Sequence, residues 1–183
     1  MYNKHIKMLS ENDIVDLGKT LTGKSSTRLK KYENRDGYIY ADFKLDQNAQ
    51  MANALGKTKI FSVNAKFNDY SIDGTINSYY PLNSEKYFEK FVSYMVNRLG
   101  RDYAEKLYSY HKSIIDEIEI FSKKFQHTSE LTENNPEVAS YFAEKSHIMK
   151  MDYEKKLKKL KTLINENLYG NDKIENFDIL NNI

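Results

Sequence analysis

Cationic side chains gather in one segment near the start of the sequence. Between residues 19 and 35 the chain carries six cations against a single acid, Glu33. Lysines and arginines set among serines and threonines can hold phosphate oxygens without reading base identity. We therefore predict a surface here that binds nucleic acid or a partner, with a solvated basic loop as the alternative. Its cations are Lys19, Lys24, Arg28, Lys30, Lys31 and Arg35.

The same segment contains a match to a phosphate-binding loop. Residues 18–25, GKTLTGKS, fit the pattern G-x-x-x-x-G-K-[ST]. In that motif backbone N–H groups hold the phosphates, the lysine reaches the terminal phosphates and the hydroxyl binds Mg²⁺. The motif needs a buried strand before it and a helix after it, whereas residues 13–17 are short and contain two aspartates. Nucleotide binding is therefore an alternative, as is a helix-turn-helix over residues 14–32 with Gly23 in the turn.

A second group of cations lies near the end of the sequence, where five lysines surround Leu157 and Leu160. A basic amphipathic helix can meet nucleic acid, anionic lipid or an acidic partner. Lysine stems can also cover an apolar seam while the ammonium groups stay in water. We include these lysines as candidate binding residues, namely Lys155, Lys156, Lys158, Lys159 and Lys161.

Tyrosine is abundant (15 residues) and tryptophan is absent. Tyr38 and Tyr40 alternate with Ile39 and Ala41, so both tyrosines are predicted on one face of a strand, beside Lys44. An aromatic pair with a lysine on an open sheet can stack bases, as in sheet-based RNA readers. Packing against other elements is the alternative role.

Candidate catalytic residues are few. The four histidines, at positions 5, 111, 127 and 147, are dispersed and have no metal-ligand spacing. There is no cysteine and no Gly-x-Ser-x-Gly elbow. We predict that the protein is not an enzyme and has no cofactor and no metal.

The elements that must position these residues follow from periodicity. Ser10 is predicted to cap a helix that runs to Leu21, and residues 22–31 to form a turn followed by a short helix or a mobile loop. Alternation over 38–45, over 61–67 and around an Asp-Gly pair at 73–74 predicts a three-stranded antiparallel sheet in residues 37–80, with its hairpin turn at that pair. A short helix is predicted over residues 46–55.

Helical periodicity replaces alternation from residue 84 onward. Phe88, Val92, Met95 and Leu99 form one stripe that stops at Gly100. Helices over 102–125 and 136–168, the second beginning at Pro136, carry apolar residues at near-heptad spacing and are predicted to form an antiparallel hairpin. The stripes are Tyr103, Leu107, Tyr110, Ile114, Ile118, Phe121 and Phe125 on the first, and Val138, Tyr141, Ile148, Tyr153, Leu157, Leu160, Ile164 and Leu168 on the second.

Together these patterns predict an α+β protein with a small three-stranded antiparallel sheet followed by long helices that form an antiparallel hairpin. We expect one compact domain made of a basic segment (1–36), the sheet with its short helix (37–82), a helical region (84–169) and an acidic tail (170–183). The net charge is only +2, so local clustering and not overall charge points to nucleic acid. Zero cysteines, no apolar leader and no membrane-spanning run predict a cytoplasmic protein without a membrane partner.

The predicted function is that of a non-catalytic binding protein that engages nucleic acid or a nucleoprotein complex. The lysine- and asparagine-rich, proline-poor composition is typical of low-GC bacteria and their phages. It favours a phage or mobile-element accessory protein that inhibits a host defence nuclease, in the manner of anti-CRISPR proteins. The alternatives are a coiled-coil interaction module that dimerises through the helical hairpin, and a nucleotide binder that uses residues 18–25.

Overall fold

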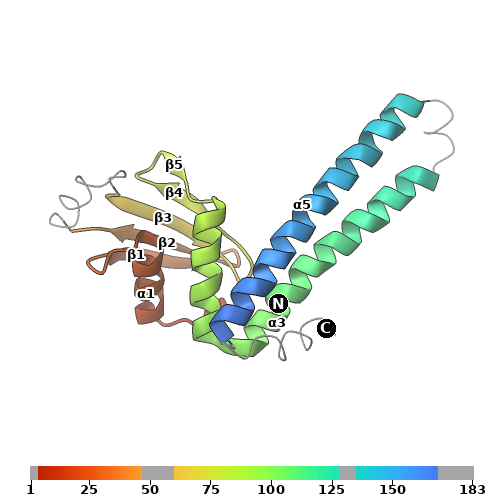
Figure 1. Ribbon diagram of the computed structural model, residues 1–183. Coiled ribbons are helices and arrows are strands. Elements are labelled where there is room, and N and C mark those ends of the chain that lie inside the picture. Colours follow the sequence, from red (N-terminus) through yellow and green to blue (C-terminus); the bar gives the residue numbers. More distant parts are fainter. Residues whose placement is uncertain (1–3, 47–59, 128–134, 169–183) are drawn as a thin grey trace. The chain divides into compact units, whose positions relative to one another are not determined.

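The computed structural model describes residues 4–46, 60–127 and 135–168 (Figure 1). The chain divides into two compact units, Met1–Tyr103 and Ala104–Ile183. The predicted helix over residues 46–55 and the acidic tail lie outside the described residues, apart from Asp46 itself. The predicted α+β class, with an antiparallel sheet and long helices, is confirmed.

The first unit opens with a 3-10 turn, η1 (Ile6–Met8), and helix α1 (Glu11–Thr22). The predicted cap at Ser10 is confirmed: the Ser10 hydroxyl accepts a hydrogen bond from the Asp13 N–H, and the Asp13 carboxylate accepts one from the Ser10 N–H. This reciprocal arrangement satisfies two N–H groups that a helix start otherwise leaves unpaired. Gly23 ends the helix in the left-handed conformation, with φ 70°.

The sheet has five strands, not the three that were predicted. They are β1 (Arg28–Arg35), β2 (Tyr38–Lys44), β3 (Ser62–Phe67), β4 (Ile72–Ile76) and β5 (Tyr80–Pro81). Each strand is antiparallel to the next, so the spatial order follows the sequence. β1 replaces the short helix or mobile loop predicted for residues 22–31.

The predicted turn at Asp73-Gly74 is wrong, because these two residues lie inside β4. The chain instead turns before them, where the Asn68 side-chain oxygen accepts hydrogen bonds from the Tyr70 and Ser71 N–H groups. Gly74 pairs with Ala65 across the strands, and a side chain at residue 74 would collide with the Asn64 carbonyl. The glycine therefore permits close approach of two strands here rather than a reversal of the chain.

One face of the sheet is the core of the first unit. Its strands supply alternating buried residues, and α1 with the first part of α3 (Glu85–His127) lies on this face (Figure 1). Gly18 of α1 packs so closely on Phe43 that a β-carbon at residue 18 would overlap the ring. The Phe67 and Phe91 rings join β3 to α3 edge-to-face, with centroids 5.8 Å apart. No described element of this unit covers the opposite face.

Helix α3 also holds the start of α1. The Arg98 guanidinium Nε lies 2.7 Å from an Asp13 carboxylate oxygen, and this hydrogen bond is the main reason that the pKa of Asp13 is lowered. The Tyr94 hydroxyl donates to the Asp13 carbonyl at 2.7 Å, and burial raises the pKa of Tyr94 to about 12. The phenol therefore stays protonated and remains a donor at any physiological pH.

The two long helices begin and break where the sequence predicts. Gly100 has φ 79° and ψ −159°, a conformation essentially restricted to glycine, so α3 is interrupted there. Helix α5 (Pro136–Leu168) starts at the predicted proline. Its predicted stripe is wrong in the first half, since Val138 is 42%, Tyr141 55% and Ile148 47% exposed.

The less exposed positions of α5 follow a different heptad register. These positions recur at alternating spacings of four and three residues. They hold small or polar residues in the first half of the helix and large, mostly apolar residues in the second half. Because the first of these positions hold small residues, the pattern of large apolar side chains does not reveal them. The positions are Ala139, Ala143, Ser146, Lys150, Tyr153, Leu157, Leu160 and Ile164.

Candidate nucleic-acid interface

The face of the sheet opposite the helices carries the candidate site. Residues that pair across neighbouring strands point to the same face, so the register decides which side chains meet. Arg28 pairs with Lys44, Lys31 with Asp42 and Arg35 with Tyr38. Tyr40 in turn pairs with Lys66 of β3. Five cations and two tyrosines share this face with three acids, Glu33, Asp42 and Asp73.

An aromatic cluster occupies one end of this face. The Tyr38 and Tyr40 rings are 6.4 Å apart and tilted by 58°. The Lys66 ammonium lies 4.4 Å from the centre of the Tyr38 ring and 5.6 Å from the centre of the Tyr40 ring. The Arg35 guanidinium, on β1, lies 4.5 Å from the centre of the Tyr40 ring. Cations at these distances are attracted by the negative faces of the rings.

Arg35 keeps its positive charge at any physiological pH. The pKa of Arg35 is raised, first by a hydrogen bond with the Tyr40 side chain and then by the charge of Glu33. Arg35 also approaches Glu33 at 3.9 Å and Asp36 at 3.8 Å, both on the exposed surface. Such exposed pairs are weak, so the guanidinium stays available to a stronger anion.

The other end of the face is purely cationic. Arg28 and Lys44 are direct cross-strand neighbours, both are exposed, and neither forms an ion pair with any residue that the structure describes. Two like charges placed opposite each other repel. Between the two ends, Lys31 lies 3.6 Å from Asp42 and is partly neutralised.

The remaining cations of the predicted basic segment lie elsewhere on the first unit. Lys19 is on α1 and Lys24 lies in the turn after it, while Lys30 falls where the pairing of β1 shifts register. The structure places Arg28, Lys31 and Arg35 on the same face as the two tyrosines and Lys44, two groups that the sequence identified only separately. Lys19 and Lys24 lie outside this strand face, and Lys30 has no cross-strand partner that assigns it to one face.

Lys66 is the site residue that the sequence analysis missed. The signal was present, because β3 was predicted from the inward residues Val63, Ala65 and Phe67. Strict alternation then places Lys66 on the outer face. What the sequence did not supply is the pairing of β2 with β3 that sets Lys66 beside the tyrosines.

The predicted phosphate-binding loop does not have the context that this interpretation requires. Gly18 and Thr22 are buried within α1, and a strand follows the turn, which reverses the strand-loop-helix order of the motif. The Thr22 hydroxyl hydrogen-bonds to the Gly18 carbonyl at 3.0 Å and to the Thr27 hydroxyl at 2.6 Å, so it serves the fold. The helix-turn-helix prediction is also wrong, since residues 28–32 are extended and not helical.

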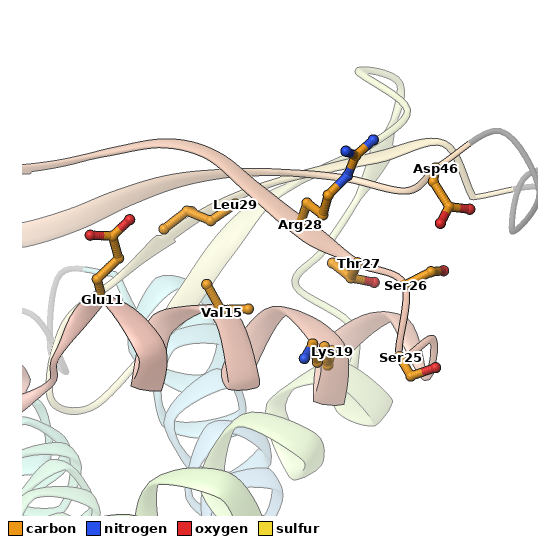
Figure 2. A pocket seen from close by; sticks show the side chains of 9 residues that line it. All are labelled: Glu11, Val15, Lys19, Ser25, Ser26, Thr27, Arg28, Leu29 and Asp46. Carbon is orange, nitrogen blue, oxygen red and sulfur yellow. The ribbon is translucent and has the colours of Figure 1, made fainter.

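A groove of about 540 Å³ lies where α1 faces the start of β1 (Figure 2). Lys19 faces two carboxylates at its walls, whereas the Arg28 side chain points away from α1 (Figure 2). The Thr27 hydroxyl is already engaged with Thr22 and with the Lys24 carbonyl. The groove therefore has no net preference for an anion. It is lined by Glu11, Val15, Lys19, Ser25, Ser26, Thr27, Arg28, Leu29 and Asp46.

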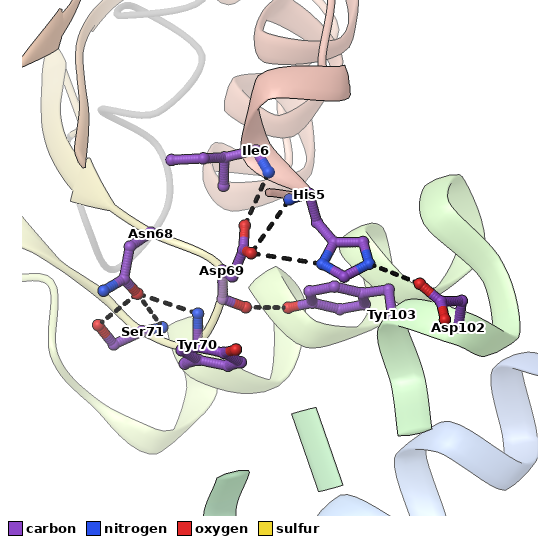
Figure 3. Close-up of polar contacts among 8 residues, drawn as sticks. All are labelled: His5, Ile6, Asn68, Asp69, Tyr70, Ser71, Asp102 and Tyr103. Carbon is purple, nitrogen blue, oxygen red and sulfur yellow. Dashed lines mark hydrogen bonds and ion pairs between the residues drawn. The ribbon is translucent and has the colours of Figure 1, made fainter. Parts of the chain in front are cut away.

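A second polar cluster surrounds His5 (Figure 3). Its Nδ1 lies 3.3 Å from a carboxylate oxygen of the fully buried Asp69, and its Nε2 lies 2.9 Å from an oxygen of Asp102. Asp69 also accepts hydrogen bonds from the N–H groups of His5 and Ile6, and its carbonyl accepts one from Tyr103 at 2.6 Å. A histidine that faces a carboxylate at both ring nitrogens has no free nitrogen to act as a general base. We interpret this cluster as structural.

The lysines of the second predicted cluster lie on α5 in the second unit. Lys155, Lys156, Lys158 and Lys159 are exposed, and the Lys156 ammonium lies 5.1 Å from the Tyr153 ring. Lys161 is half-buried, with its ammonium 5.2 Å from the Tyr108 ring of α3. At least two of the five lysine stems therefore lie along aromatic side chains, as snorkelling lysines do.

Comparison with known proteins adds nothing to this picture, because neither family models nor searches of curated proteins and solved structures give a match. Among the described residues, no cluster of three or more His, Cys, Asp or Glu side chains is placed to hold a metal ion. None of the described helices is long and apolar enough to cross a membrane.

Proposed function

We propose that this protein is a non-catalytic nucleic-acid-binding protein and that the open face of its sheet is the binding surface. The observation that carries the proposal is the cluster in which Arg35 and Lys66 lie against the Tyr38 and Tyr40 rings. Rings and guanidinium planes can stack on bases, and the cations draw in the phosphates between them. A nucleic-acid partner and a cysteine-free chain suit a cytoplasmic location.

Electrostatics supports the same surface. Five cations against three acids make this face basic although the whole chain is nearly neutral. Phosphate contacts by lysine and arginine release counterions, so affinity falls steeply as salt rises. Lys19 and Lys24, outside the face, and Lys30, at the register shift of β1, extend the positive field around it. The α5 lysines are a second basic surface on the other unit.

The test is fluorescence anisotropy with labelled DNA and RNA oligonucleotides at about 50 mM and about 200 mM salt. We expect binding that weakens at the higher salt. Replacing Lys24, Arg28, Lys30 and Lys31 with glutamine should weaken binding and flatten its dependence on salt. The matched control replaces Lys7 and Lys106, exposed lysines on other elements, and should change little. Unchanged affinity in the first variant, or no binding by the native protein, contradicts the proposal.

We also propose that α5 and the part of α3 after Gly100 form the predicted antiparallel hairpin. Two contacts support it: the Lys161 ammonium with the Tyr108 ring, and the Lys150 ammonium with the Glu119 carboxylate at 2.6 Å. From Tyr108 to Glu119 the chain advances by eleven residues on α3, and from Lys161 to Lys150 it retreats by eleven on α5. Equal steps in opposite directions fit an antiparallel pair.

The second candidate function is homodimerisation through this hairpin. It is favoured by large apolar side chains that are exposed on α5, including Tyr141, Phe142, Ile148 and Met149. Antiparallel packing of two α5 helices would also bring the lysine-rich half of one copy near Glu137 and Glu144 of the other. Sedimentation over a range of concentrations tests this, and Phe142→Lys should shift a dimer to monomer. A native protein that is monomeric throughout contradicts it.

Inhibition of a host defence nuclease stays a prediction from composition, since no contact in the described residues bears on it. A nucleic-acid-like or nucleoprotein target would meet the same cationic and aromatic face.

A further inference from the structure

We infer that the ligand of the open sheet face is a single strand, whose bases stack at the Tyr38–Tyr40 end and whose backbone phosphate is held by Arg28 and Lys44 at the other end. This inference rests on the proposed function and specifies the substrate class of the same site. It assigns different chemistry to the two ends of one face.

The aromatic end requires unpaired bases. A base can stack on a side chain only where one of its flat faces is free, and in a duplex both faces are covered by neighbouring base pairs. Tyr38 and Tyr40 rise from the face of a sheet and not from a helix or ribbon that could enter a groove. Arg35 lies against the Tyr40 ring, and because a guanidinium is planar it extends the stacking surface instead of blocking it.

The cationic end supplies a place for a phosphate. Arg28 and Lys44 are adjacent, exposed and without an ion-pair partner among the described residues. A phosphate between them would replace their mutual repulsion with two charge-assisted hydrogen bonds. By contrast, Lys31 is held by Asp42, which leaves the middle of the face nearly neutral.

The separation of the two ends sets the length of strand that is needed. From Tyr40 to Lys44 β2 advances four residues, or roughly 13 Å at about 3.3 Å per residue. A stacked strand carries one charge per about 3.4 Å, so about four stacked nucleotides, or fewer when extended, reach from the rings to the phosphate site. Both ends can therefore engage one short oligonucleotide.

The experiment measures anisotropy of four labelled probes of about eight nucleotides, a length within the site sizes of single-strand binders. They are single-stranded DNA, single-stranded RNA, a duplex of the same sequence and an abasic DNA strand. We expect at least one of the two single strands to bind at least about tenfold more tightly than the duplex or the abasic strand, since stacking is lost in both of the latter. Comparison of the affinities for single-stranded DNA and single-stranded RNA shows which of the two nucleic acids the site prefers.

Variants separate stacking from charge. The double variant Tyr38→Leu with Tyr40→Leu should lose about tenfold or more in affinity for the single strand and leave abasic binding unchanged. Tyr38→Phe with Tyr40→Phe keeps the rings and should retain binding, which also guards against a folding defect. Arg35→Lys keeps the charge but loses the plane, and should weaken single-strand binding more than abasic binding.

Arg28→Gln with Lys44→Gln should weaken binding of the abasic strand and the normal strand by the same factor, and lower the salt slope by about 0.7, the contribution of one phosphate on a single strand. Duplex or abasic binding as tight as single-strand binding, or full affinity in the leucine variant, overturns the inference while phosphate binding stands. If none of the four probes binds, the proposed function itself is wrong.

Discussion

The His5 cluster predicts that Asp69 is the most sensitive polar residue of the first unit. The Asp69 carboxylate is fully buried and accepts three hydrogen bonds, from the Ile6 N–H at 2.7 Å, the His5 N–H at 3.1 Å and the His5 ring at 3.3 Å. Asp69→Ala removes all three and leaves two backbone N–H groups without their acceptor. Each buried group left unsatisfied costs about 1–3 kcal/mol, and two N–H groups lose their acceptor here. We therefore expect a loss of about 4 kcal/mol.

Thermal unfolding followed by circular dichroism gives the measurement. A loss of that size corresponds to a fall in Tm of roughly 10 °C for a chain of this length. The matched control is Asp102→Asn, because the Asp102 side chain contacts the same imidazole but is 68% exposed and should cost less than about 1 kcal/mol. Asp69→Asn keeps one acceptor oxygen and should fall between the two. If Asp69→Ala lowers the Tm no more than Asp102→Asn does, the Asp69 hydrogen bonds do not hold the amino-terminal turn.

Three further predictions concern the elements around the site. The folded pKa of Asp13 lies below its ordinary value of 3.8, so its contribution to stability is complete above that pH and is lost as pH falls through the lower folded pKa. Asp13→Asn should therefore cost about 1 kcal/mol at pH 7 and progressively less below about pH 4 in urea titrations; a difference independent of pH contradicts this. Gly18→Ala, which would normally stabilise a helix, should instead destabilise it by about 1–3 kcal/mol because of overlap with Phe43, and a gain in Tm would refute that packing. Glu119→Lys should lower the Tm and Lys150→Glu added to it should restore part of the loss, whereas additive losses would count against the antiparallel register.

The success of sequence reasoning depended on whether an element has one strongly buried face. β2 and β3 were predicted because Ile39, Ala41 and Phe43, and then Val63 and Ala65, alternate with polar residues. β1 was missed because seven of its eight residues are exposed, so no period of two is visible in its hydropathy. Its extended state comes from pairing with β2, which is information that lies outside the segment.

The candidate site likewise combines features that are visible within a segment with features that only strand pairing determines. The cations of β1 and the Tyr38–Tyr40 pair were both identified from residue type, as two separate features. Only the register of β1 on β2 and of β2 on β3 unites them with Lys66. The less exposed positions of α5 were missed for a different reason, because Ala139 and Ala143 are partly buried while the larger Val138 and Tyr141 are exposed.

The position of β1 has a consequence for handling the protein. This strand is the outermost of the described strands in the order β1-β2-β3-β4-β5, so no described strand pairs with its edge away from β2. Such an edge invites strand-to-strand aggregation, and natural proteins prevent it with charged side chains and bulges. β1 has both, since Arg28, Lys30, Lys31 and Arg35 repel a second copy and the register shifts between Leu29 and Lys31. Neutralising these cations removes a safeguard against self-association, so variants of them should carry glutamine and not apolar residues. A loss of affinity should be attributed to lost ligand contacts only when the variant still elutes from a sizing column at the native size.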